Sequence, residues 1–386
     1  MAFHSITNYI YKWEEIKMKK ITILSLAIML IMVTGSAAAY NFSARSFGMG
    51  GAFTGLADDV SAVLYNPAGV NQSGLVGLKA TGGLSTTDYS KFSDVMDIEG
   101  HMDDDSMNYD KLYKEFPDGA DLQGQGFIGL NLKSLALSAN VENHFSLSKD
   151  STTASITNDA MVEGALTMGN KILTPPMNIG AISYGANLKM IKLRYDEYSV
   201  DKDKTNPQKT EITANGDSYG LDVGLLAKIT DMVTLGAQVD NLWVDDYKLE
   251  GTEKNYKYNQ DPNNPGWKEP TSSSYTEKGD RLKRTMRVGA SVQIPVLAAT
   301  VAADIDNFPL LTEGDRDMIY HLGIEKNILF NGISLRAGTY TDPDDDNFYT
   351  AGIGLNLWKI HMDLGVGSND GFNDSITGVL SGNIKF

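Results

Sequence analysis

Histidine is the residue most often used for acid–base catalysis near neutral pH, and few histidines are present in this chain of 386 residues. Apart from His4, they are His101, His144, His321 and His361. A serine hydrolase also needs a serine and a carboxylate in a fixed constellation with one of them, and no nearby serine lies in a recognisable nucleophile motif. Cysteine is absent, which excludes thiol nucleophiles, disulfides and cysteine-ligated metals. We therefore expect no enzymatic activity and no cofactor.

Acidic side chains outnumber basic ones, 49 to 33, and give a formal net charge of -16. A chain this acidic lacks the positive field that binding to phosphate backbones requires, so no nucleic-acid partner is expected. Two dense acidic clusters, Asp103–Asp105 and Asp342–Asp346, offer the oxygen ligands that Ca²⁺ takes, but neither has the spacing of an EF-hand loop. We interpret them as solvated loop charge and predict no metal site, with Ca²⁺ binding as the open alternative.

Residues 1–39 have the composition of an export leader. From Met18 to Ala39, two lysines precede an apolar run, Ile21–Val33, and a stretch of small residues, which is the three-part layout of a secretory signal peptide. The apolar run is shorter than the roughly 20 residues that span a bilayer, which disfavours a membrane anchor. We expect Sec-type export with cleavage after Ala39. Met18 is interpreted as the translation start, so residues 1–17 are left out of the fold.

From about residue 73 onward, the sequence consists of segments in which polar and apolar residues alternate. The connections between these segments are alternately short and long. This alternation predicts antiparallel strands. Fourteen segments are predicted as strands: 73–85, 121–132, 134–148, 157–171, 178–197, 217–228, 232–248, 282–294, 296–306, 317–326, 331–341, 347–357, 359–368 and 375–386. Tight turns at one end and long polar loops at the other, such as 86–120, 198–216 and 249–281, are the layout of an outer-membrane barrel. The sequence therefore predicts an all-β fold, a transmembrane antiparallel β-barrel of about 14 strands, over residues 73–386.

The two-residue period is clearest near the C-terminus. In segment 347–357, Tyr349 and Ile353 fall on one face, and Thr350 and Asn356 fall on the opposite face. The apolar face suits lipid, and the polar face suits an aqueous lumen. The alternative is a soluble β-sandwich, which explains neither the leader nor the alternation of connection lengths.

Ionisable residues occupy the lumen face of the predicted strands. They are Asp222, Asp240, Asp304, His321, Glu325, Arg336, His361 and Asp363. A polar lumen is usual in barrels of this kind, and salt bridges that brace the wall or hold an inner segment are the favoured use. Contact with the head group of a substrate is the alternative. Arg45, which precedes the first strand, is a candidate partner for one of these carboxylates.

Residues 43–70 differ in composition from everything that follows them. Several glycines and an Asn-Pro turn predict a compact, irregular segment. Its motif residues are Arg45, Gly48, Gly50, Gly51, Asp58, Asp59, Asn66 and Pro67. A phosphate-binding loop at Gly48–Gly51 is disfavoured, because the spacing is not G-x-G-x-x-G and no strand–loop–helix unit surrounds it.

This motif resembles the opening of a known family of barrels. The strings ARSFGMGGAF (44–53), ADD (57–59) and YNPAG (65–69) are similar to the start of the FadL/OmpP1/TodX superfamily of outer-membrane proteins, which includes PorV-type secretion and TraF-like conjugal-transfer relatives. The resemblance implies a fourteen-stranded barrel with residues 40–72 folded as a hatch, or plug, inside the lumen. It is strong over residues 43–70 and architectural thereafter. The late motifs Ser334–Gly338 and Phe348–Leu355 are more similar to the TraF/PorV relatives.

The resemblance implies two functions. One is FadL-like passive transport of hydrophobic small molecules, such as long-chain fatty acids, across the cell outer membrane, with release when the hatch rearranges around a Gly48–Gly51 hinge. The alternative is a PorV/TraF-like accessory of secretion or conjugal transfer that binds another protein. Outer-membrane lipids are partners in both cases. The terminal Phe386 resembles the signal read by the barrel-assembly machinery.

Overall fold

The computed structural model describes residues 43–88, 119–173, 180–201, 208–259, 266–279, 282–341, 347–369, 371–373 and 375–386. The predicted leader, His101 and both acidic clusters, Asp103–Asp105 and Asp342–Asp346, lie outside these residues. Within them, strands predominate and the helices are short. No helix in the described ranges is long and apolar enough to cross a membrane.

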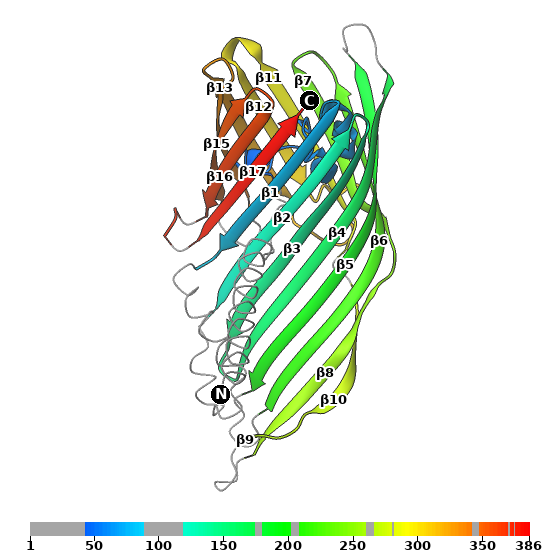
Figure 1. Ribbon diagram of the computed structural model, residues 1–386, viewed down its shortest axis with the longest axis vertical. Helices are drawn as coiled ribbons and strands as arrows, with labels where there is room; N and C mark the ends of the chain where they lie inside the picture. Colours follow the sequence, from blue (N-terminus) through cyan, green and yellow to red (C-terminus); the bar gives the residue numbers. More distant parts are fainter. Residues whose placement is uncertain are drawn as a thin grey trace, which may run out of the picture.

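Antiparallel strands form a closed, tilted barrel (Figure 1). In order around the wall they are β1 (Val76–Thr86), β2 (Ala120–Leu132), β3 (Leu135–Lys149), β4 (Thr153–Leu173), β5 (Ala181–Asp201), β6 (Gln208–Lys228), β7 (Val233–Val244), β11 (Thr285–Ile294), β12 (Ala299–Asp306), β13 (Ile319–Ile328), β14 (Ile333–Tyr340), β15 (Phe348–Leu357), β16 (Ile360–Ser368) and β17 (Ile376–Lys385). β1 pairs with β17, which closes the barrel. The predicted fourteen-stranded barrel is confirmed, and every predicted strand matches one of these.

One predicted connection is wrong. Residues 249–281, predicted as a long loop, contain β8 (Lys248–Asn259) and β10 (Thr271–Lys278), with a short β9 (Gly266–Trp267) paired to β8. β8 pairs with the first half of β6, which itself begins nine residues before the predicted strand, at Gln208 instead of 217. Apart from Leu249 at its base and a few tyrosines, the sequence of this hairpin is polar, and the hairpin projects beyond the wall at the end opposite the C-terminus (Figure 1).

The outer face of the barrel carries the apolar belt of a membrane protein. On β5, Ile182, Tyr184, Leu188 and Met190 point outward and are 38 to 61% exposed, and the next outward residue is the exposed Lys192. From 182 to 190 the strand rises about 26 Å, which a tilt near 40° reduces to about 20 Å, close to the apolar band of an outer-membrane barrel. The alternation predicted for β15 is confirmed, since Tyr349 and Ile353 are exposed.

The described N-terminal residues, 43–73, lie inside the barrel near the end where the chain terminates (Figure 1), and we call them the plug. They form α2 (Ala44–Phe47), α3 (Ala62–Tyr65) and the 3-10 helix η1 (Pro67–Gln72). The same end holds the tight connections between strands, so we call it the short-turn end and the opposite one the long-loop end. The plug thus fills the lumen at the short-turn end.

Candidate functional site

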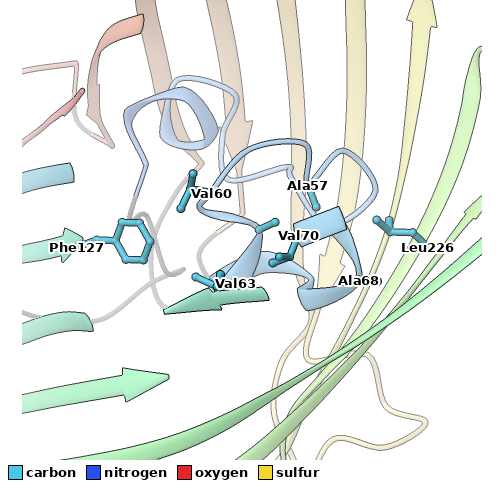
Figure 2. Packing of buried hydrophobic residues seen from close by; sticks show 9 residues of the cluster. Ala57, Val60, Val63, Ala68, Val70, Phe127 and Leu226 are labelled. Carbon is cyan, nitrogen blue, oxygen red and sulfur yellow. The ribbon is translucent and has the colours of Figure 1, made fainter. Parts of the chain in front are cut away.

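Apolar contacts hold one side of the plug to the wall. Val60, Val63 and Val70 of the plug form a cluster that reaches Phe127 of β2 and Leu226 of β6 (Figure 2). All five side chains are at most 4% exposed. Burial of each such side chain stabilises by roughly 1.5–3 kcal/mol, so these contacts fix the plug firmly against this part of the lumen.

Inward-facing glycines on most strands make room for the plug. At each of these glycines, an added Cβ would lie within about 3 Å of a plug atom. The glycines are Gly77, Gly129, Gly169, Gly185, Gly224, Gly236, Gly289, Gly323, Gly338, Gly352 and Gly365. Pro67, the first residue of η1, lies directly against Gly169 of β4 and Gly185 of β5. The wall therefore has a band of backbone surface whose height matches that of the plug. The sequence analysis missed this signal, a glycine on the lumen face of successive strands.

Gly50 is a point of very close approach between plug and wall. Its φ is +64°, a left-handed conformation that favours glycine. Its N–H donates to Thr350 Oγ1 at 3.0 Å, and its carbonyl lies 2.6 Å from His321 Nδ1. A Cβ here would lie 2.6 Å from backbone atoms of Thr339, so no other residue fits without moving the plug.

Two polar side chains bind the plug backbone around Thr54. Asp304 Oδ2 accepts hydrogen bonds from the N–H groups of Phe53 and Thr54, both at 2.7 Å. Asn66 Nδ2 donates to the Thr54 carbonyl at 3.1 Å and to the Leu225 carbonyl of β6 at 2.9 Å. Asp304 is thus a wall residue that positions the plug. Asn66 is a plug residue that binds both another segment of the plug and the wall.

A network of charges joins the plug to β13, β14 and β16. Arg45 of α2 binds Asp58 of the plug at 2.5 Å and Glu325 of β13 at 2.8 and 3.0 Å. Arg336 of β14 binds the same Glu325 at 2.7 Å and Asp363 of β16 at 2.8 Å. The Arg45–Glu325 contact has two parallel bonds, the strongest arrangement for such a pair. The expected pairing of Arg45 with a lumen carboxylate is therefore present in the structure.

Between this network and the turns, a polar cavity of about 460 Å³ opens toward the short-turn end. Its lining includes Arg45, Asp58, Asp59, Glu325, Asn327, Phe330, Ser334, Arg336, Asn356, Trp358, His361, Asp363, Asn383 and Lys385. His361 Nδ1 lies 2.7 Å from Asn356 Oδ1, whose own amide nitrogen donates to Asn331 and Ser334. The cavity lies between the plug and the turns, so a molecule that passed the plug would enter it.

Asp59 and Lys79 form a buried ion pair between the plug and β1. Lys79 Nζ lies 2.8 Å from Asp59 Oδ2 and also donates to Ser43 and Ser61. Burial by itself would raise the pKa of Asp59, but Lys79 and Arg45 outweigh it and hold the pKa well below its ordinary value. The stabilisation from this carboxylate is therefore complete above the ordinary aspartate pKa of about 4 and is lost only as the pH falls through the lowered value.

Replacement of Lys79 by methionine should loosen the plug at neutral pH. Asp59 would remain buried without its nearest cation, and breaking a buried pair in this way costs about 3–5 kcal/mol. The pKa of Asp59 should rise, so the defect should shrink as the pH is lowered and the carboxyl becomes neutral. Thermal unfolding followed by circular dichroism at pH 7 and pH 4 measures both effects. Lys133→Met, in an exposed turn, is the matched control, and equal melting temperatures for the two variants at pH 7 would contradict the prediction.

All of the predicted lumen residues point into the barrel, where they contact the plug, the wall or the cavity. Asp222 binds Lys189 of β5 at 2.8 Å and the N–H of Asn241, at a bulge in β7. Asp240 accepts a hydrogen bond from the side-chain nitrogen of Gln238.

Two further glycines of the predicted plug motif shape its backbone: Gly48 ends α2, and Gly51 has a φ of +83°.

The sequence analysis missed several charged residues of the lumen, among them Lys79, Lys189, Arg287 and Asp306. Lys79 and Lys189 point inward on β1 and β5, and Arg287 of β11 binds Asp306 of β12 at 2.6 Å. Each lies at an inward position of an alternating strand, so the two-residue period contained the signal. Among the described residues, no group of three or more histidine or acidic side chains is arranged to hold a metal ion.

No protein-family model matches the chain, and no curated protein matches its sequence. Solved structures do match it. The Pseudomonas putida toluene transporter TodX is 12% identical with a TM-score of 0.61, over 92% of this chain and 100% of that one. The Ralstonia pickettii toluene transporter TbuX is 11% identical with a TM-score of 0.60, over 89% and 98%. A Pseudomonas aeruginosa FadL homologue is 13% identical with a TM-score of 0.59, over 92% and 100%.

The chain has the fold of the FadL and TodX barrels. The resemblance predicted from residues 43–70 is thereby confirmed at the level of the fold. In this FadL-type barrel, Arg45 of the plug is bound to Glu325 of β13 and Asp59 of the plug to Lys79 of β1, and the apolar contacts of Figure 2 include Phe127 of β2 and Leu226 of β6. Charged and apolar contacts therefore both hold the plug, and they come from several parts of the wall.

Proposed function

We propose that this barrel passes hydrophobic small molecules across the outer membrane by diffusion, without energy input. The observation that carries the proposal is an apolar cluster on the lumen side of the wall. It consists of Ile191, Leu193, Ala214, Tyr247, Leu249 and Leu282, with Met161, Tyr195, Val244 and Tyr275 packed against it. A water-filled pore has a polar interior at this height, so an apolar lining indicates an apolar ligand.

The cluster lies on the route from the long-loop end to the plug. Ile191 and Leu193 point inward on β5, two and four residues beyond Lys189, which lies at the level of the plug contacts. Leu249 of β8 comes from the hairpin that extends the wall. A hydrophobic molecule would leave water at this cluster, pass the plug after a rearrangement, and reach the polar cavity at the short-turn end. Such a ligand would gain roughly 25 cal/mol for each Å² of apolar surface that it buries there.

Replacement of Ile191 by asparagine should reduce uptake of a hydrophobic probe at least tenfold. The amide would place unpaired polar groups in the apolar cluster, where each costs roughly 1–3 kcal/mol. Uptake of a radiolabelled hydrocarbon by cells that lack other such channels measures the effect. Lys192→Asn, one residue away on the outer face, is the control. Equal uptake by the two variants would remove the cluster from the route.

A second candidate function is that of an accessory protein that binds another protein, as in the PorV and TraF-like relatives. The hairpin of β8 and β10 favours it, because Tyr258 and Trp267 lie edge to face near its tip, 5.2 Å apart, beyond the membrane belt. Native mass spectrometry of the barrel purified from its own membrane separates the two functions. A bound apolar small molecule supports transport, and a bound polypeptide with no such molecule supports the accessory role.

A further inference from the structure

One part of the lumen wall holds more hydrogen-bond acceptors than donors. We call it the acceptor wall, and its residues are Asn140, Glu142, Glu163, Asn187, Asp222, Gln238 and Asp240. They come from the adjacent strands β3 to β7 and occupy inward positions. Asn140 lies opposite Glu163 in the register of β3 and β4, so their side chains are neighbours.

The carboxylates of this wall exceed the cations that reach them. Lys189 Nζ lies 2.8 Å from Asp222 and 3.4 Å from Glu163, and Glu142 and Asp240 interact electrostatically with the same lysine. Arg287, which also acts on Asp240, is bound to Asp306 at 2.6 Å. Buried carboxylates that lack a matching cation are unfavourable, and either an added proton or a ligand that supplies positive charge relieves them.

Several buried oxygens of the wall have no hydrogen-bond partner within the described part of the chain. They are Oδ1 of Asn140, Oδ1 of Asn187, Oε1 of Gln238 and Oε1 of Glu142. The three amides are at most 2% exposed. The orientation of Asn187 is fixed, because its nitrogen donates to Val63 O at 2.8 Å and to Asp222 Oδ2 at 3.0 Å. Its oxygen is therefore left without a donor, which is an observation independent of the carboxylate count.

The acceptor wall is continuous with the apolar cluster. Glu142 lies opposite Met161 in the β3–β4 register, and Met161 packs against the cluster. Lys189 and Ile191 are successive inward residues of β5. Glu142 and Asp240 are only partly buried, so the lumen reaches both of them. A molecule whose apolar part lies in the cluster would thus place its polar end against the acceptors.

We propose that the acceptor wall binds the cationic head group of a hydrophobic amine, and that the transported class is hydrophobic amines. This inference rests on the proposed transport function and specifies its substrate. An ammonium group supplies hydrogen-bond donors for the unpaired oxygens and a charge for the excess carboxylates. A carboxylate head group, as in a fatty acid, supplies neither and meets like charge.

Three ligands of equal chain length test the head group. We expect the full-length barrel in non-ionic detergent to bind decylamine at least tenfold more tightly than decanoate, with decanol between them, by calorimetry at pH 7 with micelle blanks. Glu163→Gln and Glu142→Gln keep the side-chain shape but remove a charge. Each variant should weaken the binding of decylamine at least fivefold and should change the binding of decanol little. Glu313→Gln, in an exposed loop, is the control.

The outcomes separate this inference from the transport function. Equal affinity for the three ligands, or tightest binding of decanoate, would overturn the amine preference and leave hydrophobic transport standing. Failure of all three to bind would overturn both. Heat-modifiable electrophoretic migration shows whether each variant is folded. If Glu142→Gln does not fold, Asn140→Leu is the second variant, because it removes a buried unpaired oxygen without changing charge and should weaken decylamine binding.

Discussion

A valine at position 338 should displace the plug and open the barrel. The missing side chain of Gly338 on β14 makes room for Met49 and Gly50, and a Cβ there would lie 2.8 Å from Gly50 Cα and closer still to other backbone atoms of the plug. Backbone atoms cannot change rotamer, so the clash is relieved only by movement of the plug. Overpacking commonly costs about 1–3 kcal/mol even where side chains give way. We therefore expect at least a tenfold increase in conductance in planar bilayers.

The control for this experiment is the neighbouring residue. Ala337 lies on the same strand and points outward into lipid, so Ala337→Val adds a similar volume without touching the plug. Its conductance should equal that of the unmodified protein. If Gly338→Val, folded by heat-modifiable migration, conducts no better than Ala337→Val, then the plug does not seal the lumen in the way that the contacts indicate.

Removal of the Arg45 side chain should loosen the plug from β13. Arg45→Ala leaves Glu325 with Arg336 as its remaining cation and leaves Asp58 without its partner. A hydrogen bond to a charged group contributes about 1.5–3 kcal/mol, so loss of the two bonds to Glu325 corresponds to at least a hundredfold increase in the open population. Arg45→Lys restores the positive charge but should recover only part of the loss, because an ammonium cannot make the two parallel bonds to Glu325.

The absence of cysteine provides a direct readout of this opening. A single cysteine in place of Val63, which is 1% exposed in the plug, reacts with a maleimide only when the plug moves. Its labelling rate should rise about a hundredfold with Arg45→Ala, and should fall back substantially in Arg45→Ala with Glu325→Gln, because that carboxylate charge is then gone. An unchanged labelling rate in Arg45→Ala would mean that these charges do not hold the plug.

The fold was predictable because lipid and lumen impose opposite demands on alternate residues. Each predicted strand was found in the wall, since every strand crosses the apolar belt. The hairpin of β8 and β10 was missed for the same reason: it lies beyond that belt, and its sequence is polar except for Leu249 and a few tyrosines. The ends of β6 and β5 nearest this hairpin were underestimated for the same cause.

The candidate site was predictable in its members but not in its pairings. The inward positions of Glu325 and Arg336 follow from the two-residue period, whereas the contact between Arg45 and Glu325 joins residues 280 apart in the chain. Only the register of fourteen strands and the fit of the plug bring such residues together. Lys79 and Lys189 also lie at inward positions that follow from the same period, but their ion pairs with Asp59 and Asp222 depend on the tertiary fold.

The central claim is that ligands cross this barrel past a plug that must move. Ala44 of the plug and Ser381 of β17 lie close together, with 2.8 Å between the backbone nitrogen of Ala44 and Ser381 Oγ. If a disulfide forms between cysteines at these two positions, it ties the plug to the wall. In cells that lack other channels for such compounds, uptake of a hydrophobic probe should stop under oxidising conditions and return on reduction. Uptake that continues at the unmodified rate with the disulfide formed would contradict the account.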